Sequence, residues 1–432
     1  MIIYLSVIIL FLLLIVGVPV PFCFAGSTIF LLITGGYSPD FLMPSGYSKI
    51  ANIVLLCIPL FIIAGGIIRE GKIGDALVGF VEQFIGRYKS GLGTVTVITC
   101  AIFGAISGSA AATLSSVGSI MAPKLIKKGY PRGIGASLIG SSCVLALLIP
   151  PSSAQVLYAW TGNQSVLACF LATVGPGLLL AALLSIVQHF QVRKLTNIQS
   201  TVVNQINRKN VIKNTGHATP ALLMPVIILG GIYGGIMTPM EAAAVAALYC
   251  VPVAIFFYKG ITFRSLGKTL TEAAASTGAV MLMLMSAMLF SRILVMEHVP
   301  DMLLNFMMGI TTNKYLILLM LNVLMVIIGM LMDDGSGIML CTPLLLPIVK
   351  SLGVSPIHFA AILGVNLGMG NITPPTAPML YFASQVGDSP VGEMLKPTMQ
   401  LIIFAWLPTV IITTYVPELS LTLPRLILGG RF

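Results

Sequence analysis

Two proline pairs lie inside long apolar segments of the sequence, Pro150-Pro151 in the first half and Pro374-Pro375 in the second. Each proline removes a backbone amide donor and frees a carbonyl one turn earlier, so two in succession should unwind a turn of helix. Ser and Thr flank both pairs, and their hydroxyls, together with the freed carbonyls, are hard oxygen ligands of the kind that small cations prefer. Non-helical backbone at membrane depth survives only around a cavity filled with water or ligand. The pairs therefore predict two helix breaks that bind cations.

A polar tip between two apolar stretches precedes each proline pair. The first tip is Ser107-Gly108-Ser109, and the second runs from Asp333 to Gly337. Such tips offer carbonyls, hydroxyls and helix N-termini, and helix N-termini attract anions. An ionised carboxylate inside an apolar region is expensive and marks a functional site by default. Because adjacent side chains cannot both enter one cavity, we expect Asp333 to face the second site and Asp334 to cap the following helix.

The composition places most of the chain in lipid. Of its 432 residues, 57% are hydrophobic and 8% are charged, and the mean hydropathy is +1.02. A soluble domain devotes about 25% of its residues to charge, so this chain could not cover a water-facing surface. Apolar runs of about 18 or more residues, long enough to cross a bilayer, recur from end to end. The first begins at Met1 without a charged n-region, so we expect no cleavable signal peptide.

The net charge of +10 does not indicate nucleic-acid binding. The 23 basic residues occur in short loops between apolar spans, which is how the positive-inside rule distributes them. The seven cysteines are scattered singly and form no C-x-x-C pair, so we interpret them as small hydrophobic residues. Trp160 and Trp406 suit the interfacial aromatic belt. Glu241 and Glu272 suit helix starts, where a carboxylate caps the N-terminus.

Helix breakers and charge clusters divide this all-α, multi-spanning membrane fold into two halves of similar outline. The first half covers 1–192, a basic cytoplasmic linker covers 193–218, the second half covers 219–416, and a C-terminal tail covers 417–432. In the first half we expect scaffold spans over 1–68, a re-entrant hairpin over 92–127, a broken helix over 133–162 and a span over 166–190. In the second half we expect a hairpin over 315–350 and a broken helix over 356–386. We expect a polar loop around Pro39, Asp40 and Pro44.

A shift of 224 residues, the separation of Pro150 and Pro374, aligns the two halves. The same shift pairs Pro123 with Pro347 and places the first tip over the second. It also pairs Gly129 with Gly353, Ala136 with Ala360 and Gly140 with Gly364. Proline and glycine set backbone geometry, so their coincidence at one offset indicates a duplicated fold.

Charge placement predicts that the two copies are inverted relative to each other. The basic linker and the cluster from Lys124 to Arg132 should be cytoplasmic. Counting spans from the linker, the basic loop 259–268 returns to the cytoplasm, and the acidic corner from Glu297 to Asp301 falls outside. The first hairpin therefore has its base on the cytoplasmic face and the second has its base on the outer face.

Many short motifs of this chain have the order and spacing of one known family. They are Gly17-Val18-Pro19, Ile58-Pro59-Leu60-Phe61 with Ala64-Gly65, Ile106-Ser107-Gly108-Ser109-Ala110, Gly129-Tyr130-Pro131, Ile149-Pro150-Pro151-Ser152, Gly175-Pro176-Gly177, Thr238-Pro239 with Glu241-Ala242, Met332-Asp333 and Thr373-Pro374-Pro375. Over nearly its whole length the sequence resembles the large membrane subunit of TRAP (tripartite ATP-independent periplasmic) transporters.

The resemblance implies an elevator-type, sodium-coupled transporter of the bacterial inner membrane, with a scaffold and a mobile transport domain. It also implies a small four-helix membrane subunit and a periplasmic binding protein that delivers an organic acid anion, such as a C4-dicarboxylate or sialic acid. Matched residue by residue, its sodium ligands would be Ser107, Ser109, Ile149, Pro150 and Ser152 in the first half and Asp333, Ser336, Thr373 and Thr376 in the second. The substrate-binding candidates are Ser109, Ser153, Asn366 and Thr376, and Asn366 equally suits an interhelical hydrogen bond.

The sequence departs from the family pattern at three positions beside these sites. Thr113 stands where the first tip usually continues with an Asp. Thr376-Ala377-Pro378 follows the second proline pair in place of a hydrophobic residue and Gly. Asp334 replaces a residue that is commonly neutral.

We also consider two alternative functions, a different kind of transporter and an enzyme. A stand-alone sodium–dicarboxylate symporter has a related architecture and needs no binding protein. An intramembrane enzyme is disfavoured, because the sequence lacks H-E-x-x-H and its only adjacent acidic pair is contiguous rather than split between two helices.

Overall fold

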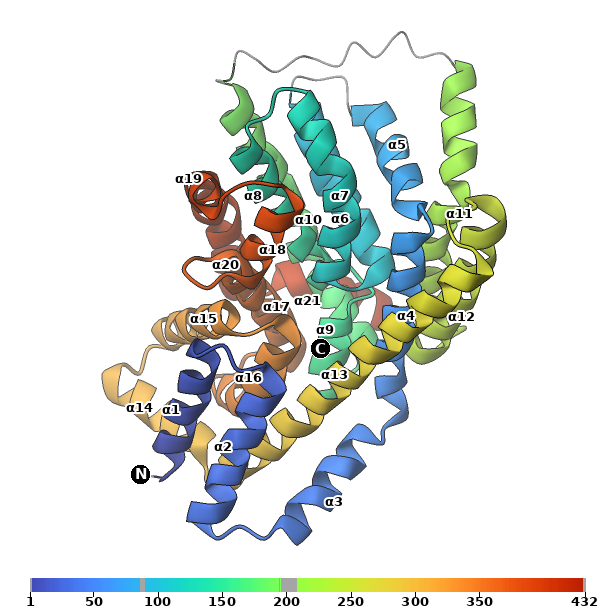
Figure 1. Cartoon of the computed structure of the whole chain (residues 1–432). Helices are drawn as coiled ribbons and strands as arrows, with labels where there is room; N and C mark the ends of the chain where they lie inside the picture. The colour runs from blue at the N-terminus through green and yellow to red at the C-terminus, as the bar shows by residue number, and fades with distance from the viewer. Residues whose placement is uncertain (1, 86–89, 194, 196–207, 430–432) are drawn as a thin grey trace.

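The computed structural model describes residues 2–85, 90–193, 195 and 208–429, and within these ranges the chain is helical, without strands (Figure 1). The first half contains α1 (Ile2–Ile15), α2 (Val20–Gly35), α3 (Pro39–Ile50), α4 (Cys57–Glu70), α5 (Ile73–Ile85), α6 (Gly91–Ser107), α7 (Ala110–Lys127), α8 (Arg132–Cys143), α9 (Ser153–Thr161) and α10 (Val166–Arg193). The second half contains α11 (Arg208–Tyr233), α12 (Pro239–Pro252), α13 (Phe263–Met296), α14 (Val299–Ile310), α15 (Lys314–Leu331), α16 (Asp334–Ser351), α17 (Pro356–Ile372), α18 (Pro378–Val386), α19 (Val391–Leu401), α20 (Leu407–Tyr415) and α21 (Glu418–Leu428). Short 3-10 segments (Ile53–Leu56, Val144–Leu147) and π-helical turns (Val253–Phe257, Ile402–Trp406) extend α4, α8, α12 and α19.

Seven helices in the described ranges are long and apolar enough to cross a membrane. They are Ile53–Glu70, Val166–Arg193, Thr215–Tyr233, Pro239–Phe257, Phe263–Met296, Lys314–Leu331 and Val391–Tyr415. The remaining apolar helices, including α6, α8 and α17, have 10–17 residues and fall short of the usual span length. The prediction of an all-α, multi-spanning fold is confirmed.

The longest helix, α13, has 34 residues, which corresponds to a length of about 51 Å. A hydrocarbon core is roughly 30 Å thick, so a helix of this length must tilt within it. Figure 1 shows α13 crossing the front of the molecule diagonally. It begins in the basic loop, at Phe263 just after the Thr262 cap, and ends at Met296, immediately before the acidic corner. Its two ends therefore carry the charge signs expected of the cytoplasmic and outer faces.

Both hairpins and both breaks form. The first hairpin is α6 and α7, and the second is α15 and α16. Helical structure stops at Leu147 and resumes at Ser153 around the first proline pair, and it stops at Ile372 and resumes at Pro378 around the second. Each break contains a cis peptide bond between its two prolines.

The helix bounds of the two halves follow the shift of 224 residues. α7 and α16 begin at Ala110 and Asp334 and end at Lys127 and Ser351, so both bounds differ by this shift. Helices of one half also pack against the hairpin of the other half, since α9 contacts α16 and α18 contacts α7. These correspondences support the predicted duplication, while the orientation of the two copies in a membrane stays a prediction.

Small residues allow the helices behind each tip to cross closely. A methyl group on Gly104 would lie 2.7 Å from the Cα of Ala146, and one on Gly370 would lie 2.7 Å from the Cα of Gly329. Ala146 and Gly370 are related by the 224-residue shift. Small residues at such crossings are typical of helix packing in membranes, where close backbone approach supplies much of the attraction.

Other sequence predictions need correction. The region predicted as a polar loop is α3, whose N-cap Ser38 accepts a hydrogen bond from the Asp40 amide and whose first residue is Pro39. The predicted tail contains α21, which packs against α10 and α17. Trp406 is fully buried rather than interfacial. Half of the predicted linker, at 194 and 196–207, lies outside the described residues, and its last part, 208–218, is the start of α11.

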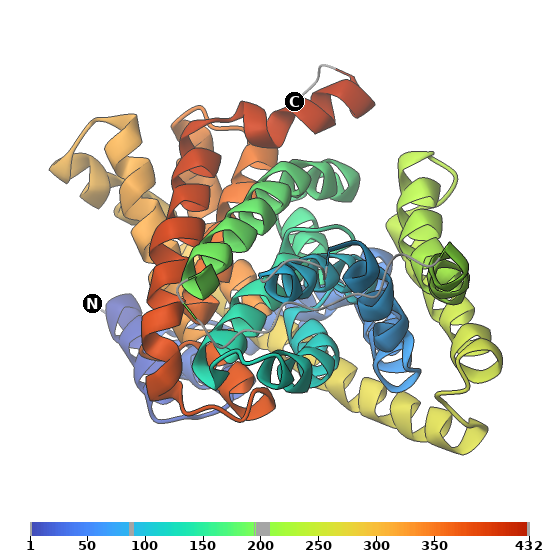
Figure 2. The ribbon, with the colours of Figure 1, turned by 90° about the horizontal axis from the view of Figure 1, so that it is seen from above.

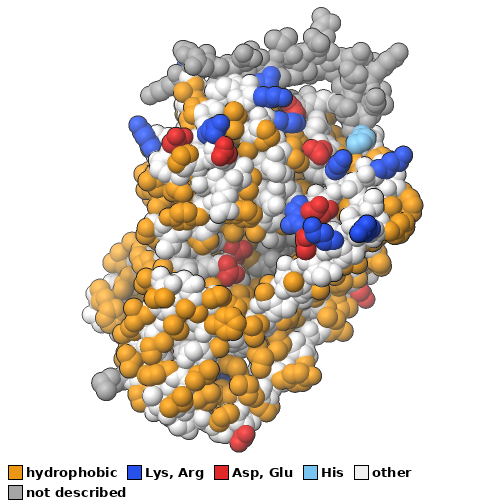
Figure 3. All heavy atoms as spheres, in the orientation of Figure 1, with side chains coloured by type: hydrophobic (Ala, Val, Ile, Leu, Met, Phe, Trp, Pro, Cys, Tyr) orange, Lys and Arg blue, Asp and Glu red, His pale blue; other side chains and the backbone are white. Residues whose placement is uncertain are grey.

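The outer surface agrees with a membrane environment. On the face shown in Figure 3 the Lys and Arg side chains gather in the upper part, whereas hydrophobic side chains cover most of the lower part. Figure 2 shows α11 and α12 at one edge of the molecule and α14 at the opposite edge, with the hairpins and broken helices between them. The seven cysteines are all buried and free, as the sequence predicts for small hydrophobic residues.

We predict that Gly370→Ala lowers the stability of the protein by about 1–3 kcal/mol, because the new methyl group would meet backbone atoms of α15 that cannot move independently. The matched control is Gly278→Ala in α13, where nothing lies within 4 Å of the added methyl group. Thermal unfolding in detergent measures both variants, and equal melting temperatures for the two would contradict the close crossing.

Candidate functional site

A cavity of about 630 Å³ lies beside the first hairpin tip. α4 lines one side with Gly65, Gly66 and Arg69, and α13 contributes a stretch from Thr269 to Val280. The first tip and the start of α7 line the opposite side, and Phe382 of α18 also reaches the cavity. Glycine, alanine and serine make up much of the lining, so the space exists because these side chains are small. The cavity thus lies between the first hairpin tip, α4 and α13.

The first tip is held by its own hydroxyls. Ser109 is the N-cap of α7, and its Oγ accepts a hydrogen bond from the Ala112 amide at 3.4 Å. Thr113 Oγ1 donates to the Ser109 carbonyl at 2.8 Å and lies 3.1 Å from Ser107 Oγ. Thr113 therefore fixes the tip by neutral hydrogen bonds. Gly108 joins the two helices with φ of 62°, in the left-handed region that glycine tolerates.

The first break contacts the first tip directly. The amide and the hydroxyl of Ser153 donate to the Gly108 carbonyl at 3.2 and 2.8 Å. Ser152 is fully buried, and its Oγ has no hydrogen-bond partner among the described residues. Pro150 is buried and Ile149 is half-buried beside it. The structure thus brings together the sodium candidates Ser107, Ser109, Ile149, Pro150 and Ser152, with Ser153 as the link.

At the second tip the roles of Asp333 and Asp334 differ from those that we predicted. Asp333, not Asp334, is the N-cap of α16, and its Oδ2 accepts from the amides of Gly335 and Ser336 at 3.1 and 3.4 Å. The Ser336 hydroxyl also donates to Asp333. The prediction that Asp334 caps this helix is wrong, because the helix begins at Asp334 and the capping position is therefore residue 333.

Asp334 instead connects the second tip to the second broken helix. Its Oδ1 accepts a hydrogen bond from Asn371 Nδ2 at 2.6 Å. Asn371 is fully buried, and its Oδ1 has no hydrogen-bond partner among the described residues. Thr373 Oγ1 donates to the Met369 carbonyl at 2.6 Å, which caps the end of α17. Asn371 was not among the site residues predicted from the sequence.

The two remaining candidates of the second half, Thr376 and Asn366, lie in different parts of the structure. Thr376 is exposed in the break, where its hydroxyl donates to the Met330 carbonyl. Asn366 is fully buried in α17, and its Nδ2 donates to Asn322 Oδ1 at 3.0 Å. Asn322 in turn donates to Thr414 of α20 at 3.0 Å. Asn366 therefore makes the interhelical hydrogen bond that was one of its two interpretations.

α13 contacts both tips. Its residues from Thr269 to Val280 line the cavity at the first tip, and three residues later Met283 Sδ lies 2.8 Å from Ser336 Oγ of the second tip. α13, which lies outside the hairpins, thus passes the N-termini of both α7 and α16. Among the described residues no group of three or more His, Cys, Asp or Glu side chains could hold a metal ion. A cation at either break would depend on carbonyl, hydroxyl and amide oxygens, with Asp334 beside the second break.

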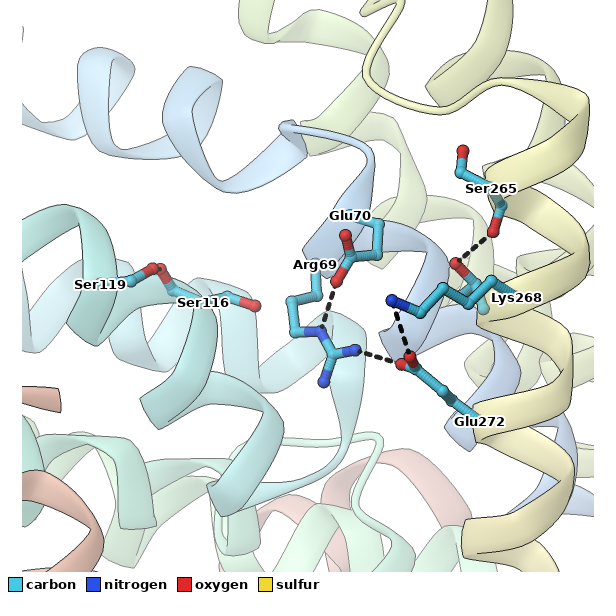
Figure 4. A network of polar contacts seen from close by, with 8 residues as sticks. Arg69, Glu70, Ser116, Ser119, Ser265, Lys268 and Glu272 are labelled. Atoms are coloured by element: carbon cyan, nitrogen blue, oxygen red, sulfur yellow. Dashed lines mark hydrogen bonds and ion pairs between the residues drawn. The ribbon is translucent and has the colours of Figure 1, made fainter. Parts of the chain in front are cut away.

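An ion-pair network at the cavity was not predicted from the sequence (Figure 4). Arg69 of α4 donates through Nε to Glu70 at 3.1 Å and through Nη2 to Glu272 of α13 at 3.0 Å. Lys268 lies 3.8 Å from the same Glu272. The prediction that Glu272 begins a helix is wrong, because α13 starts at Phe263 under a capping box formed by Thr262 and Ser265. The corresponding prediction for Glu241 is confirmed, since Glu241 and Thr238 form the capping box of α12.

Comparison with known proteins identifies the family. The model of the tripartite ATP-independent periplasmic transporter DctM component matches residues 7–419. The chain belongs to this TRAP transporter family. Its relatives are transport permeases rather than enzymes, and the chain is accordingly the large permease subunit of a TRAP transporter, a multi-pass protein of the bacterial inner membrane.

Similar proteins differ in the substrate that their names give. The C4-dicarboxylate TRAP transporter large permease protein DctM of Pseudomonas aeruginosa is 35% identical, and the match covers 86% of each chain. The sialic acid TRAP transporter large permease protein SiaM of Vibrio cholerae is 30% identical over 96% of this chain and 97% of its own. The isethionate TRAP transporter permease protein DctMQ of Oleidesulfovibrio alaskensis is 34% identical over 94% of this chain, which spans only 64% of that longer protein.

A solved structure shares the fold of this TRAP subunit. The Alcanivorax borkumensis YdaH transporter superposes with a TM-score of 0.62 over 89% of each chain, at 15% sequence identity. At this identity the likeness concerns the arrangement of helices alone. The helical arrangement of the TRAP subunit therefore occurs in a transporter with a very different sequence.

We predict that Asp333→Ala destabilises the TRAP subunit by about 1 kcal/mol, because the first amides of α16 lose their capping acceptor. Asp333→Asn keeps a side-chain oxygen that caps equally well, so its stability should match the wild type. Thermal unfolding in detergent compares the two variants. Equal destabilisation by Ala and Asn would show that the charge, and not the cap, is what Asp333 contributes to folding.

Proposed function

We propose that this subunit imports an organic acid anion by sodium symport, together with a small four-helix membrane subunit and a periplasmic binding protein. One observation carries the sodium coupling. Each helix break holds a buried side-chain oxygen without a hydrogen-bond partner among the described residues, Ser152 Oγ at the first break and Asn371 Oδ1 at the second. Buried polar atoms without partners occur elsewhere in the described residues as well, and these two are distinguished by their place at the two interrupted helices, which supports a ligand there.

Sodium suits these two places chemically. The proline pairs interrupt the helices at 148–152 and 373–377, and the orphan oxygens of Ser152 and Asn371 lie in and beside these segments. A small hard cation binds to neutral carbonyl, hydroxyl and amide oxygens of this kind. Asp334 adds a carboxylate next to Asn371 at the second break only. We therefore expect the second site to hold its cation more tightly than the first.

The cavity beside the first tip suits an organic anion. The N-terminus of the 18-residue helix α7 opens onto it, and helix N-termini favour negative charge. Arg69 lies on the opposite wall. The three relatives described above are named for isethionate, a C4-dicarboxylate and sialic acid, which are all small organic anions. Anion recognition by this cavity is therefore the function that the lining residues favour.

Transport in this proposal moves the hairpins and broken helices as one body against α4 and α13. Within that body the first tip is bonded to the first break, Asp334 is bonded to Asn371, and α7 and α16 pack against helices of the other half. At the first tip the cavity occupies part of the boundary between this body and α4 and α13. At the second tip Ser336 contacts the flexible, polarisable Met283, a side chain that tolerates sliding better than a tight polar pair.

We predict that proteoliposomes holding both membrane subunits take up one of succinate, N-acetylneuraminate or isethionate only with an inward sodium gradient and the binding protein outside. The measurement is uptake of the radiolabelled acid, with potassium replacing sodium and with the binding protein omitted. Sodium-driven uptake without the binding protein would make the stand-alone symporter the correct function, and uptake in potassium alone would remove the sodium coupling.

We also predict that Ser152→Ala and Asn371→Ala each raise the sodium concentration for half-maximal uptake about tenfold, as expected for losing about 1.4 kcal/mol of cation binding. The matched control is Ser420→Ala in α21, which removes a buried hydroxyl that likewise has no described partner but lies outside both breaks. Sodium dependence that is unchanged in both break variants would overturn the assignment of the two sites.

A further inference from the structure

Arg69 is the only cationic side chain among the described residues that line the cavity, and Glu272 is the only acidic one. The two groups belong to different helices and lie 203 positions apart in the sequence. Their ion pair crosses from α4 to α13 at the cavity wall (Figure 4). On the facing helix α7, Ser116 and Ser119 lie across from the network, and Ser115 lines the cavity. An anion inside the cavity would thus meet one guanidinium.

We propose that Arg69 binds the carboxylate or sulfonate of the transported anion, which replaces Glu272 as its partner. This inference rests on the proposed function, since it names the residue that recognises the anion in that same cavity. Glu272 then forms the ion pair with Arg69 while no anion is bound in the cavity. The network contains two cations and two carboxylates, so it is neutral without substrate and gains one negative charge when the anion enters.

The geometry allows this exchange of partners. Arg69 uses Nε for Glu70 and Nη2 for Glu272, which leaves Nη1 for an oxygen of the entering anion. A planar guanidinium binds carboxylates through two parallel hydrogen bonds, and this is the strong form of the interaction. Lys268 lies one helical turn before Glu272 on α13, so Glu272 keeps a cationic neighbour when it releases Arg69.

The existing ion pairs are weak enough to be replaced. The side chains of Arg69, Glu70 and Glu272 are 36%, 50% and 48% exposed, so water screens them. Partly exposed pairs of this kind contribute little to stability, because each side chain is well hydrated when the pair opens. An anion that enters the cavity is held between Arg69 and the N-terminus of α7, and its two contacts come from opposite walls.

A purely structural role would make the Arg69–Glu272 pair a link between α4 and α13. These helices already pack along each other, and a methyl group on Gly66 of α4 would lie 3.2 Å from Thr269 Cγ2 of α13. The two roles give different expectations for a substitution of Glu272. If the pair is only a structural link, replacing Arg69 or Glu272 breaks it and should weaken anion binding to the same extent. If Arg69 binds the anion, replacing Glu272 frees Arg69 and should not weaken anion binding.

The test measures anion binding by the purified complex of both membrane subunits in sodium chloride. The probe is whichever of succinate, N-acetylneuraminate and isethionate the wild type takes up in the assay above. Its dissociation constant follows from the concentration dependence of thermal stabilisation. We expect Arg69→Gln to raise this constant about tenfold or more, the loss typical of a hydrogen bond to a charged group. We expect Glu272→Gln to leave the constant unchanged or to lower it.

The matched control is Arg132→Gln, which breaks a different exposed ion pair, to Asp388, outside the cavity. It should bind the anion like the wild type. Equal weakening by Arg69→Gln and Glu272→Gln would overturn the proposal in favour of a structural link, and unchanged binding in Arg69→Gln would also overturn it. In both cases wild-type uptake would leave the proposed function standing. A wild type that takes up none of the three acids would refute the proposed function and this inference with it.

Discussion

Backbone groups that are freed inside a membrane need partners, and this requirement organises the centre of the molecule. The two proline pairs open the broken helices, and the hairpin tips lie against the openings. At the first break the Gly108 carbonyl of the tip accepts both polar groups of Ser153. At the second break a side-chain bond between Asn371 and Asp334 makes the connection. Ser152 Oγ and Asn371 Oδ1 remain without a hydrogen-bond partner among the described residues, and these are the atoms at which we propose that cations bind.

The same constraint explains why α13 is so long and tilted. A tip is a helix end at membrane depth, and it must face something other than lipid. α13 passes both tips, first as a wall of the cavity and then through Met283 against Ser336. The hairpin tips are bonded to the broken helices, whereas α13 lines the cavity at the first tip, meets the second tip through the Met283 thioether and packs along α16. In the mechanism that we propose, the hairpins and broken helices move together as one body.

The positions of the charged side chains agree with this arrangement of the helices. The hairpin tips and helix breaks are held by neutral hydrogen bonds and by Asp333 and Asp334, whereas the ion pairs of Arg69 lie on the side of α4 and α13. In the mechanism that we propose, the exchangeable pair stays on the wall formed by α4 and α13, and the anion and the cations meet between this wall and the hairpin tips.

The sequence by itself determined the membrane class, the two hairpins, the positions of both breaks and the family. Proline, glycine and the absence of charge act locally, and their effect does not depend on what packs nearby. Tertiary structure decided which of Asp333 and Asp334 caps α16, because that depends on the residue at which the helix starts. It also decided the burial of Trp406 and the partnerships of Asn366 with Asn322 and of Arg69 with Glu272, since these groups meet only after the helices pack. Pairs separated by up to 203 positions leave no periodic signal in one sequence, so only the folded chain reveals them.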